Sequence, residues 1–238
     1  MNRFSNRIGV IVPFDMALDR EYWDLVPDDV TLHITRLGIV DMPYGPDHAR
    51  AVAEPAGLLD AARTLVRIDP EVVAFGCASA SFVDGPAGEA RVRDAIAAAG
   101  IADVTTPSGA LVEELHRIGA RRVGLGTPYE ADLGEALAAF LEASGFVPVS
   151  LVNLAYTAEE DVINAGAEVV SDLARRAMRP DADAVFLACT NLPTVPLLSS
   201  LGHDLGVPVL SANQVLMDVS VRRLGSRRSA EADLRAGS

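Results

Sequence analysis

The two cysteines of this chain are the residues whose types and spacing could do chemistry. Cys77 lies in AFGCASAS, residues 74–81, and Cys189 lies in FLACTNLP, residues 186–193. Each follows an apolar run that opens with acidic residues, DPEVVAFGC and DADAVFLAC, which is typical of a short strand. A thiol can act as a nucleophile, an acid or a base. The sequence therefore places one reactive thiol at the end of each of two similar segments.

Small and polar residues follow each cysteine: Ala78, Ser79 and Ser81 after the first, Thr190 and Asn191 after the second. Such residues often begin helices, so we expect free backbone N–H groups beside both thiols. These groups lower a thiol pKa from about 8.5 toward neutrality and can bind a carboxylate or an enolate oxygen. Burial as small core residues is the alternative, but the paired placement favours a site that holds a small acid between two thiols.

The elements that position the cysteines form an internal duplication. RIGVIVP at 7–13 and RVGLGTP at 122–128 both predict a strand that ends at proline. The equivalent glycines are 115 residues apart, and the cysteines are 112 residues apart. A third pair, residues 102–122 and 207–228, predicts a strand, a polar turn, an amphipathic helix and a glycine cap, at Gly119 and Gly225.

Helical patterns between these landmarks predict alternating strands and helices, which favours parallel sheets with right-handed crossovers. The chain is half hydrophobic and only 5% aromatic, as expected for helices packed on such sheets. We predict an α/β fold of two pseudo-two-fold related parallel-sheet lobes with the active site in the cleft between them. The first lobe would span residues 1–112, completed by 210–238, and the second 113–209. Ligands bind beyond the carboxyl ends of such strands, where both cysteines lie.

Charge and composition exclude several functions. The net charge is −13, and no arginine run with interleaved aromatics is present, so we expect no nucleic-acid partner. All 20 basic residues are arginine. Without lysine there is no pyridoxal phosphate Schiff base, no aldolase-type imine and no Walker lysine.

The N-terminal apolar run, IGVIV, is too short for a signal peptide or a membrane span, so we expect a cytoplasmic protein without a membrane partner. Two cysteines cannot complete a tetrahedral zinc site. The histidines show no metal-ligand spacing, so we expect no metal and a structural role for each of His33, His48, His116 and His203. We also expect a homodimer, because dimers are the commonest symmetric oligomers.

The turns GCASAS and ACTNLP, with RIGVIVP, RVGLGTPY and VPVLSANQV, resemble the aspartate/glutamate racemase superfamily over residues 6–225. The nearest branch is that of maleate cis-trans isomerases and arylmalonate decarboxylases. The resemblance implies a site between two lobes, a small carboxylic-acid substrate and no metal or organic cofactor. Superfamily racemases use two cysteines as acid and base, whereas the decarboxylases keep only the second. In the isomerases the residue resembling Cys77 adds to the alkene to give a succinyl adduct, and that resembling Cys189 is acid or base.

A donor-rich pocket must stabilise the developing enolate charge, so we expect substrate contacts from the residues of the two turns, Ala78, Ser79, Thr190 and Asn191. The resemblance adds two further positions. Tyr129 matches a substrate-contacting tyrosine, with an ordinary turn residue as the equal alternative. Asp15 is the nearest match to an asparagine that contacts a substrate carboxylate, with a helix N-cap as its alternative.

A second family asparagine falls near the acidic run Glu159, Glu160 and Asp161, which we expect to be solvated surface. A carboxylate facing a substrate carboxylate is repulsive unless protonated or bridged. These departures favour a substrate other than plain maleate: an amino-bearing acid, a hydantoin or a mono-acid. We expect core packing for four further side chains: Met16, Trp23, Tyr44 and Phe82.

The sequence thus predicts a cofactor-independent isomerase whose two thiols work on a small carboxylic acid, first by maleate-type cis-trans isomerisation through a covalent Cys77 adduct. The alternatives are amino-acid or hydantoin racemisation by proton transfer between two thiols, and decarboxylation of a disubstituted malonate. A non-catalytic module that binds small acids is the alternative from another class.

Overall fold

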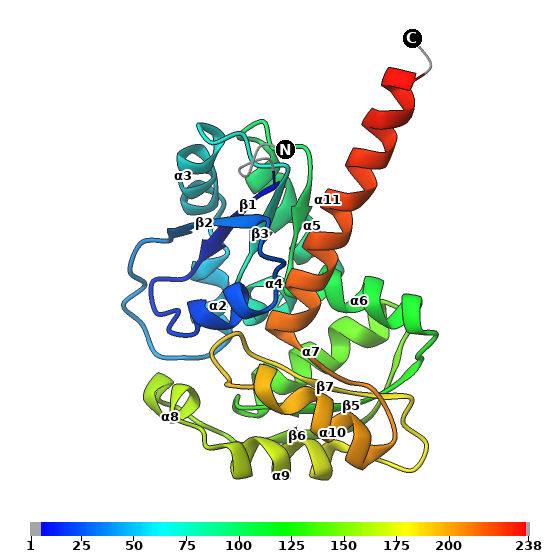
Figure 1. Ribbon diagram of the computed structural model, residues 1–238. Coiled ribbons are helices and arrows are strands. Elements are labelled where there is room, and N and C mark those ends of the chain that lie inside the picture. The colour runs from blue at the N-terminus through cyan, green and yellow to red at the C-terminus, as the bar shows by residue number, and fades with distance from the viewer. Residues whose placement is uncertain (1–5, 237–238) are drawn as a thin grey trace.

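Two parallel four-stranded sheets form the framework of the chain, and Figure 1 shows them in two lobes. The computed structural model describes residues 6–236, with side chains through residue 225. The first sheet has the order β2-β1-β3-β4 and the second β6-β5-β7-β8. All strand pairs are parallel, so both lobes repeat one arrangement. The predicted duplicated α/β fold is confirmed.

The first lobe contains the N-terminal elements. Its strands are β1 (Asn6–Val12), β2 (Val30–Arg36), β3 (Val72–Phe75) and β4 (Val104–Thr105). Its helices are α1 (Asp19–Asp24), α2 (Pro46–Val52), α3 (Pro55–Val66), α4 (Ala78–Phe82) and α5 (Gly85–Ala97). The central strand β3 is buried along its length, as expected for a parallel strand covered on both faces.

The second lobe repeats this order. Its strands are β5 (Arg122–Thr127), β6 (Val147–Asn153), β7 (Ala184–Leu187) and β8 (Val209–Ser211). Its helices are α7 (Ala131–Ala143), α8 (Glu159–Ile163), α9 (Ala167–Ala177) and α10 (Leu198–Leu205), the last preceded by a 3₁₀ turn, η1 (Val195–Leu197). The fully buried β7 is the counterpart of β3.

The last helix of each half crosses to the other lobe. Helix α6 (Pro107–Ile118) follows the first sheet, yet its Leu111 and Leu115 belong to the core of the second lobe. Helix α11 (Ala212–Ala236) follows the second sheet, yet its Leu216 and Leu224 complete the core over β1. The two helices pack against each other, and Arg222 donates to Glu114 at 2.9 Å between them. This exchange of α6 and α11 binds the lobes together. The lobe boundaries at 112/113 and 209/210 remain a prediction.

The two predicted glycine caps have different outcomes. Gly119 ends α6 in the left-handed conformation with φ 71°, and Thr106 accepts from the Gly109 N–H at the start of that helix, so this cap is confirmed. Gly225 does not end a helix but lies inside α11. A glycine inside a helix costs only about 1 kcal/mol relative to alanine, and the helix-forming residues after it continue the helix.

In residues 6–236, no helix combines the length and the apolar character needed to cross a membrane.

Candidate active site

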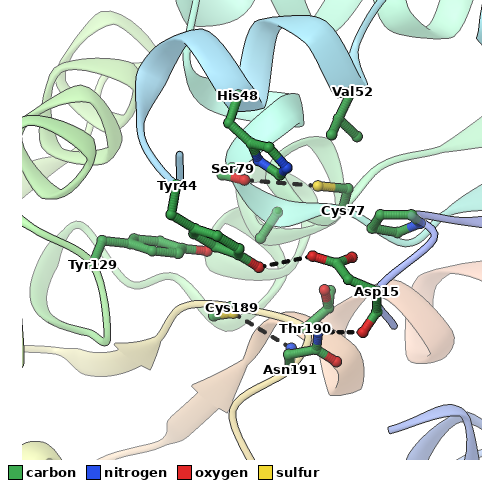
Figure 2. Close-up of a pocket in the computed structure, with 12 residues that line it drawn as sticks. Asp15, Tyr44, His48, Val52, Cys77, Ser79, Tyr129, Cys189, Thr190 and Asn191 are labelled. Carbon is green, nitrogen blue, oxygen red and sulfur yellow. Dashed lines mark hydrogen bonds between the residues drawn. The ribbon is translucent and has the colours of Figure 1, made fainter. Parts of the chain in front are cut away.

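A small pocket lies at the carboxyl ends of the central strands of both lobes (Figure 2). It is reached by the turns after β1, β3, β5 and β7 and by the segment around α2. All eight residues singled out from the sequence line it: Asp15, Cys77, Ala78, Ser79, Tyr129, Cys189, Thr190 and Asn191. Four further residues complete its wall: Pro13, Tyr44, His48 and Val52.

Cys77 lies at the N-cap position of α4 with an extended backbone, φ −134° and ψ 111°. Its Sγ is 3.7 Å from the Ser79 hydroxyl oxygen, and the nearby Ala80 backbone N–H favours the thiolate. The side chain is buried, with 7% of the residue exposed. The first cysteine therefore has the helix start and hydrogen-bond donors that its sequence predicts.

Cys189 has a different backbone. Its φ is 85°, a left-handed conformation that costs a non-glycine residue roughly 1–2 kcal/mol. Its Sγ accepts the Asn191 N–H at 3.4 Å and is hydrogen-bonded to Tyr129. No helix begins directly after it, because an irregular turn leads to η1 and α10. The expected helix start is therefore wrong here, and the strained backbone aims the second thiol into the pocket.

Burial dominates the acidity of both thiols. It raises the pKa of Cys77 to about 12 and that of Cys189 to about 11, and the Asp15 carboxylate adds to both increases. Hydrogen bonds from Ala80, Ser79, Asn191 and Tyr129 oppose burial but are outweighed. The expected lowering of the thiol pKa toward neutrality is therefore wrong, and both thiols are protonated at neutral pH in the free protein.

The two cysteine turns are held together across the lobes. The Thr190 hydroxyl donates to the Gly76 carbonyl at 3.3 Å, and Asn213 donates to the Thr190 carbonyl at 2.9 Å. Buried Glu21 of α1 accepts from Asn213 at 2.7 Å and from the N–H groups of Thr194 and Val195 at 3.0 and 3.1 Å. A first-lobe carboxylate thereby fixes the turn that carries the second-lobe thiol.

Asp15 belongs to the pocket wall rather than to a helix start, because Leu18 occupies the N-cap position of α1. One carboxylate oxygen, Oδ2, accepts from the Tyr44 hydroxyl at 2.9 Å. The other, Oδ1, is buried and has no hydrogen-bond partner among the described residues. Asn191 donates to the Asp15 carbonyl at 3.1 Å and accepts from Ala17 N–H at 2.9 Å, so its amide orientation is fixed.

Glu159 is the acidic residue that the sequence analysis placed wrongly. It is half-buried, and its Oε1 accepts from the Asn191 side-chain amide at 3.0 Å, whereas Glu160 and Asp161 are exposed as expected. Burial and the nearby Asp15 carboxylate raise the pKa of Glu159 to about 7. One member of the acidic run therefore joins the network that supports the site.

Tyr44 and His48 were missed as pocket residues. Their rings stack with centroids 4.9 Å apart, so the expected core role of Tyr44 and purely structural role of His48 do not describe their positions. Burial, with Cys189 and Asp15 adding to it, raises the pKa of Tyr44 and keeps its hydroxyl a donor. Burial lowers the pKa of His48. Met16 and Phe82 pack in the core as expected, while Trp23 is 42% exposed.

The carboxylates at the pocket are not balanced by an arginine among the described side chains. No arginine of residues 6–225 lines the pocket, while Asp15 lies in its wall and Glu159 accepts a hydrogen bond from Asn191. Anionic groups of a ligand must therefore be bound by N–H and O–H donors alone. Within the described part of the chain, no group of three or more His, Cys, Asp and Glu side chains could hold a metal ion.

Two parallel-sheet lobes that each bring a thiol to one pocket define the chain as an enzyme of the Asp/Glu racemase-like class. Within it, the chain belongs to the arylmalonate decarboxylase family, whose model matches residues 8–235. It is 33% identical over 226 residues to arylmalonate decarboxylase of Bordetella bronchiseptica, covering 94% of this chain and 92% of that enzyme.

Maleate isomerases are similar as well. That of Nocardia farcinica is 36% identical over 149 residues, 60% of this chain and 59% of that enzyme. A solved structure of the Nocardia farcinica maleate cis-trans isomerase, a cysteine-to-serine mutant with a covalently bound succinylcysteine intermediate, has a TM-score of 0.81 and 29% identity. The match covers 92% of this chain and 93% of that one.

Proposed function

We propose that the protein is a cofactor-independent isomerase that uses Cys77 and Cys189 on a small unsaturated carboxylic acid, in a cis-trans isomerisation of the maleate type. The observation that carries this proposal is the convergence of two buried thiols, from equivalent strands of the two lobes, on one small pocket. The succinylcysteine intermediate of the similar Nocardia farcinica isomerase supports a covalent route.

The chemistry requires a temporary single bond, because rotation about C=C is forbidden. The Cys77 thiolate bonds to one alkene carbon, and the π electron pair moves to the neighbouring carbon as an enediolate. Cys189 gives its proton to that carbon and becomes the thiolate. After rotation, Cys189 takes the proton back, the C–S bond breaks, and Cys77 leaves with the electron pair. Because both thiols are protonated in the free protein, the cycle starts only after Cys77 has lost its proton to solvent. One of the two thiols then stays ionised until the cycle ends, and the N–H groups of Ala80 and Asn191 favour that state.

The remaining polar groups have proposed roles as donors to the substrate. Ala78 and Ser79 begin α4, where N–H groups lack helical partners, and Ser79 adds a hydroxyl beside Cys77. These groups would bind a carboxylate and stabilise the enediolate charge. Tyr129 and Asn191 lie beside Cys189 and would position the proton donor. The apolar Pro13 and Val52 limit access of water to the adduct.

Mass spectrometry of the intact protein tests the covalent step. After incubation with maleate or with its monoamide, maleamate, Cys189→Ala should retain one substrate mass on Cys77, because the residue that resolves the adduct is missing. Cys77→Ala, the matched control, should retain none. Absence of an adduct with both compounds, in the wild type and in Cys189→Ala, would overturn the cis-trans proposal.

Racemisation or decarboxylation is the second candidate, because the match to arylmalonate decarboxylase spans 94% of this chain. One thiolate and one thiol, on opposite faces of a carbon next to a carbonyl, could take a proton and give a proton respectively, without any adduct. Deuterium incorporation from heavy water into amino acids or hydantoins, lost in both single cysteine variants, would identify racemisation. Carbon dioxide release from phenylmalonate would identify decarboxylation.

A cytoplasmic location is also proposed. Both cysteines are free and buried, and a reducing compartment keeps such thiols available for catalysis. Fractionation of the native host, followed by detection of the protein with an antibody, would test the location.

A further inference from the structure

Asp15 leaves one carboxylate oxygen unsatisfied at the pocket. Its Oδ2 has the Tyr44 hydroxyl as donor, but its Oδ1 is shielded from solvent and has no partner among the described residues. A buried acceptor without a donor is unfavourable, and the more so when it carries charge. Because Asp15 lines the same pocket as both thiols, a bound substrate is the natural source of the missing donor.

The neighbours of Asp15 supply no donor for Oδ1. The Asn191 amide is committed to the Asp15 carbonyl, Glu159 and Ala17. Among the residues whose side chains are described, no arginine lines the pocket to offset the carboxylate, and the sequence contains no lysine. A substrate carboxylate placed here would face Asp15 without a bridging cation, with Glu159 adding repulsion.

Other parts of the pocket wall can donate hydrogen bonds. The hydroxyls of Ser79 and Tyr129 line the pocket beside Cys77 and Cys189. These hydroxyls suit an anionic carboxylate, whereas the Asp15 oxygen suits a group that carries N–H bonds. A symmetric dicarboxylate satisfies only the first of these requirements.

We propose that Asp15 selects a substrate with one carboxylate and, across the double bond, a primary amide whose N–H donates to Oδ1. This inference rests on the isomerase function proposed above and names its substrate class, a cis-unsaturated dicarboxylic acid monoamide. Such a compound is isosteric with maleate and keeps the alkene conjugated to a carbonyl at both ends. A charge-assisted N–H to carboxylate bond replaces a contact between two like charges.

The saturated analogues succinamate and succinate test this selection without turnover. Calorimetric titration at pH 7.5 should show that the wild-type protein binds succinamate at least about tenfold more tightly than succinate, a ratio expected from one charge-assisted hydrogen bond. Asp15→Asn, an isosteric change that removes the charge, should reduce that ratio at least about tenfold. Asp161→Asn is the matched control, because this exposed aspartate lies outside the pocket and should leave the ratio unchanged.

Equal or tighter binding of succinate by the wild type would overturn the inference, as would binding of neither analogue. An unchanged ratio in a folded Asp15→Asn variant, verified by circular dichroism, would do the same. The wild-type ratio does not depend on any variant, so a misfolded Asp15→Asn would leave the test intact. The expected ratio without a Cys77 adduct from either maleate or maleamate would support the selection but refute the isomerase function, which separates the two proposals.

Discussion

The Thr190 hydroxyl donates a hydrogen bond to the Gly76 carbonyl, with 3.3 Å between the oxygens. One partner directly follows Cys189 and the other directly precedes Cys77, so a single contact joins the two turns that carry the thiols. The turns belong to different lobes. The separation of the two thiols is therefore set by direct bonding between the lobes as well as by packing around them.

Thr190→Val should lower both stability and catalysis. Valine keeps the shape but removes the donor, which leaves the buried Gly76 carbonyl unsatisfied at a cost of about 1–3 kcal/mol. We expect kcat to fall at least about tenfold, the effect of about 1.4 kcal/mol on the barrier, because the thiols lose their relative position. Steady-state kinetics and urea unfolding measure the two effects.

The control for this variant is Thr64→Val. The exposed Thr64 hydroxyl also donates to a carbonyl, that of Ala61, at 2.7 Å, but it lies on α3 away from the pocket. Its kcat should equal that of the wild type. A Thr190→Val variant with unchanged kcat would show that the contact does not position the thiols.

Alkylation of the thiols should be slow at neutral pH and accelerate steeply with pH. The pKa of about 12 for Cys77 and about 11 for Cys189 predicts that the rate rises about tenfold per pH unit between 7 and 10, because only the thiolate reacts. Cys77→Ala and Cys189→Ala isolate each thiol, and Cys189 should react faster. Iodoacetamide labelling followed by mass spectrometry measures both rates.

The unfolded protein is the reference for this experiment. In guanidinium chloride both cysteines should show an ordinary thiol pKa of about 8.5, and their rates should level off above it. An alkylation rate that levels off below pH 9 in the folded protein would show that burial does not raise the thiol pKa values.

Glu159 should make the protein less stable as the pH rises. Its pKa is raised from 4.5 to about 7 in the folded state, so its stabilising contribution is complete below pH 4.5 and is lost as the pH passes through 7. Glu159→Gln should flatten this dependence and be the more stable protein at pH 8. We expect a difference of at most about 1 kcal/mol, because the half-exposed side chain is screened by solvent.

Urea unfolding at pH 5 and pH 8 measures this effect. Glu160→Gln removes an exposed carboxylate from the adjacent position and should retain the pH dependence of the wild type. If the unfolding free energies of Glu159→Gln and the wild type changed equally between pH 5 and pH 8, the raised pKa of Glu159 would be contradicted.

Gly124 should be indispensable for the packing of α9 on the second sheet. A Cβ at this position would collide with the Ala177 carbonyl oxygen, which is backbone and already accepts from Ser150. Gly124→Ala should cost about 1–3 kcal/mol of unfolding free energy, as overpacking does. Gly57→Ala on α3 meets no atom within 4 Å and should be neutral or slightly stabilising. Chemical unfolding of both variants checks this, and equal stability would contradict it.

The sequence predicted the fold well because the duplication repeats every landmark. The strands before Cys77 and Cys189 are buried apolar runs, and their carboxyl ends meet where parallel-sheet topology requires. The same logic, with the family resemblance, placed all eight chosen residues around one pocket. Their individual roles in binding and catalysis remain proposals.

The remaining parts of the site depend on tertiary contacts that have no local pattern. Tyr44 lies in an irregular segment, and nothing in its neighbours predicts the hydrogen bond to Asp15. In the sequence Glu159 looks like a surface acid. Its contact with Asn191, which lies in the turn after β7, has no local pattern. The predicted direction of the thiol pKa shifts was wrong. The sequence indicated the N–H groups that lower a thiol pKa, but it did not indicate the extent of burial, which raises it.

The crossing of α11 to the first lobe determines the order in which the protein can be completed during translation. Ile8 and Val10 are synthesised long before Leu216 and Leu224, which close the apolar surface over them. A nascent chain therefore holds β1 partly uncovered until α11 has left the ribosome. The pocket, which needs both lobes, is among the last features to form.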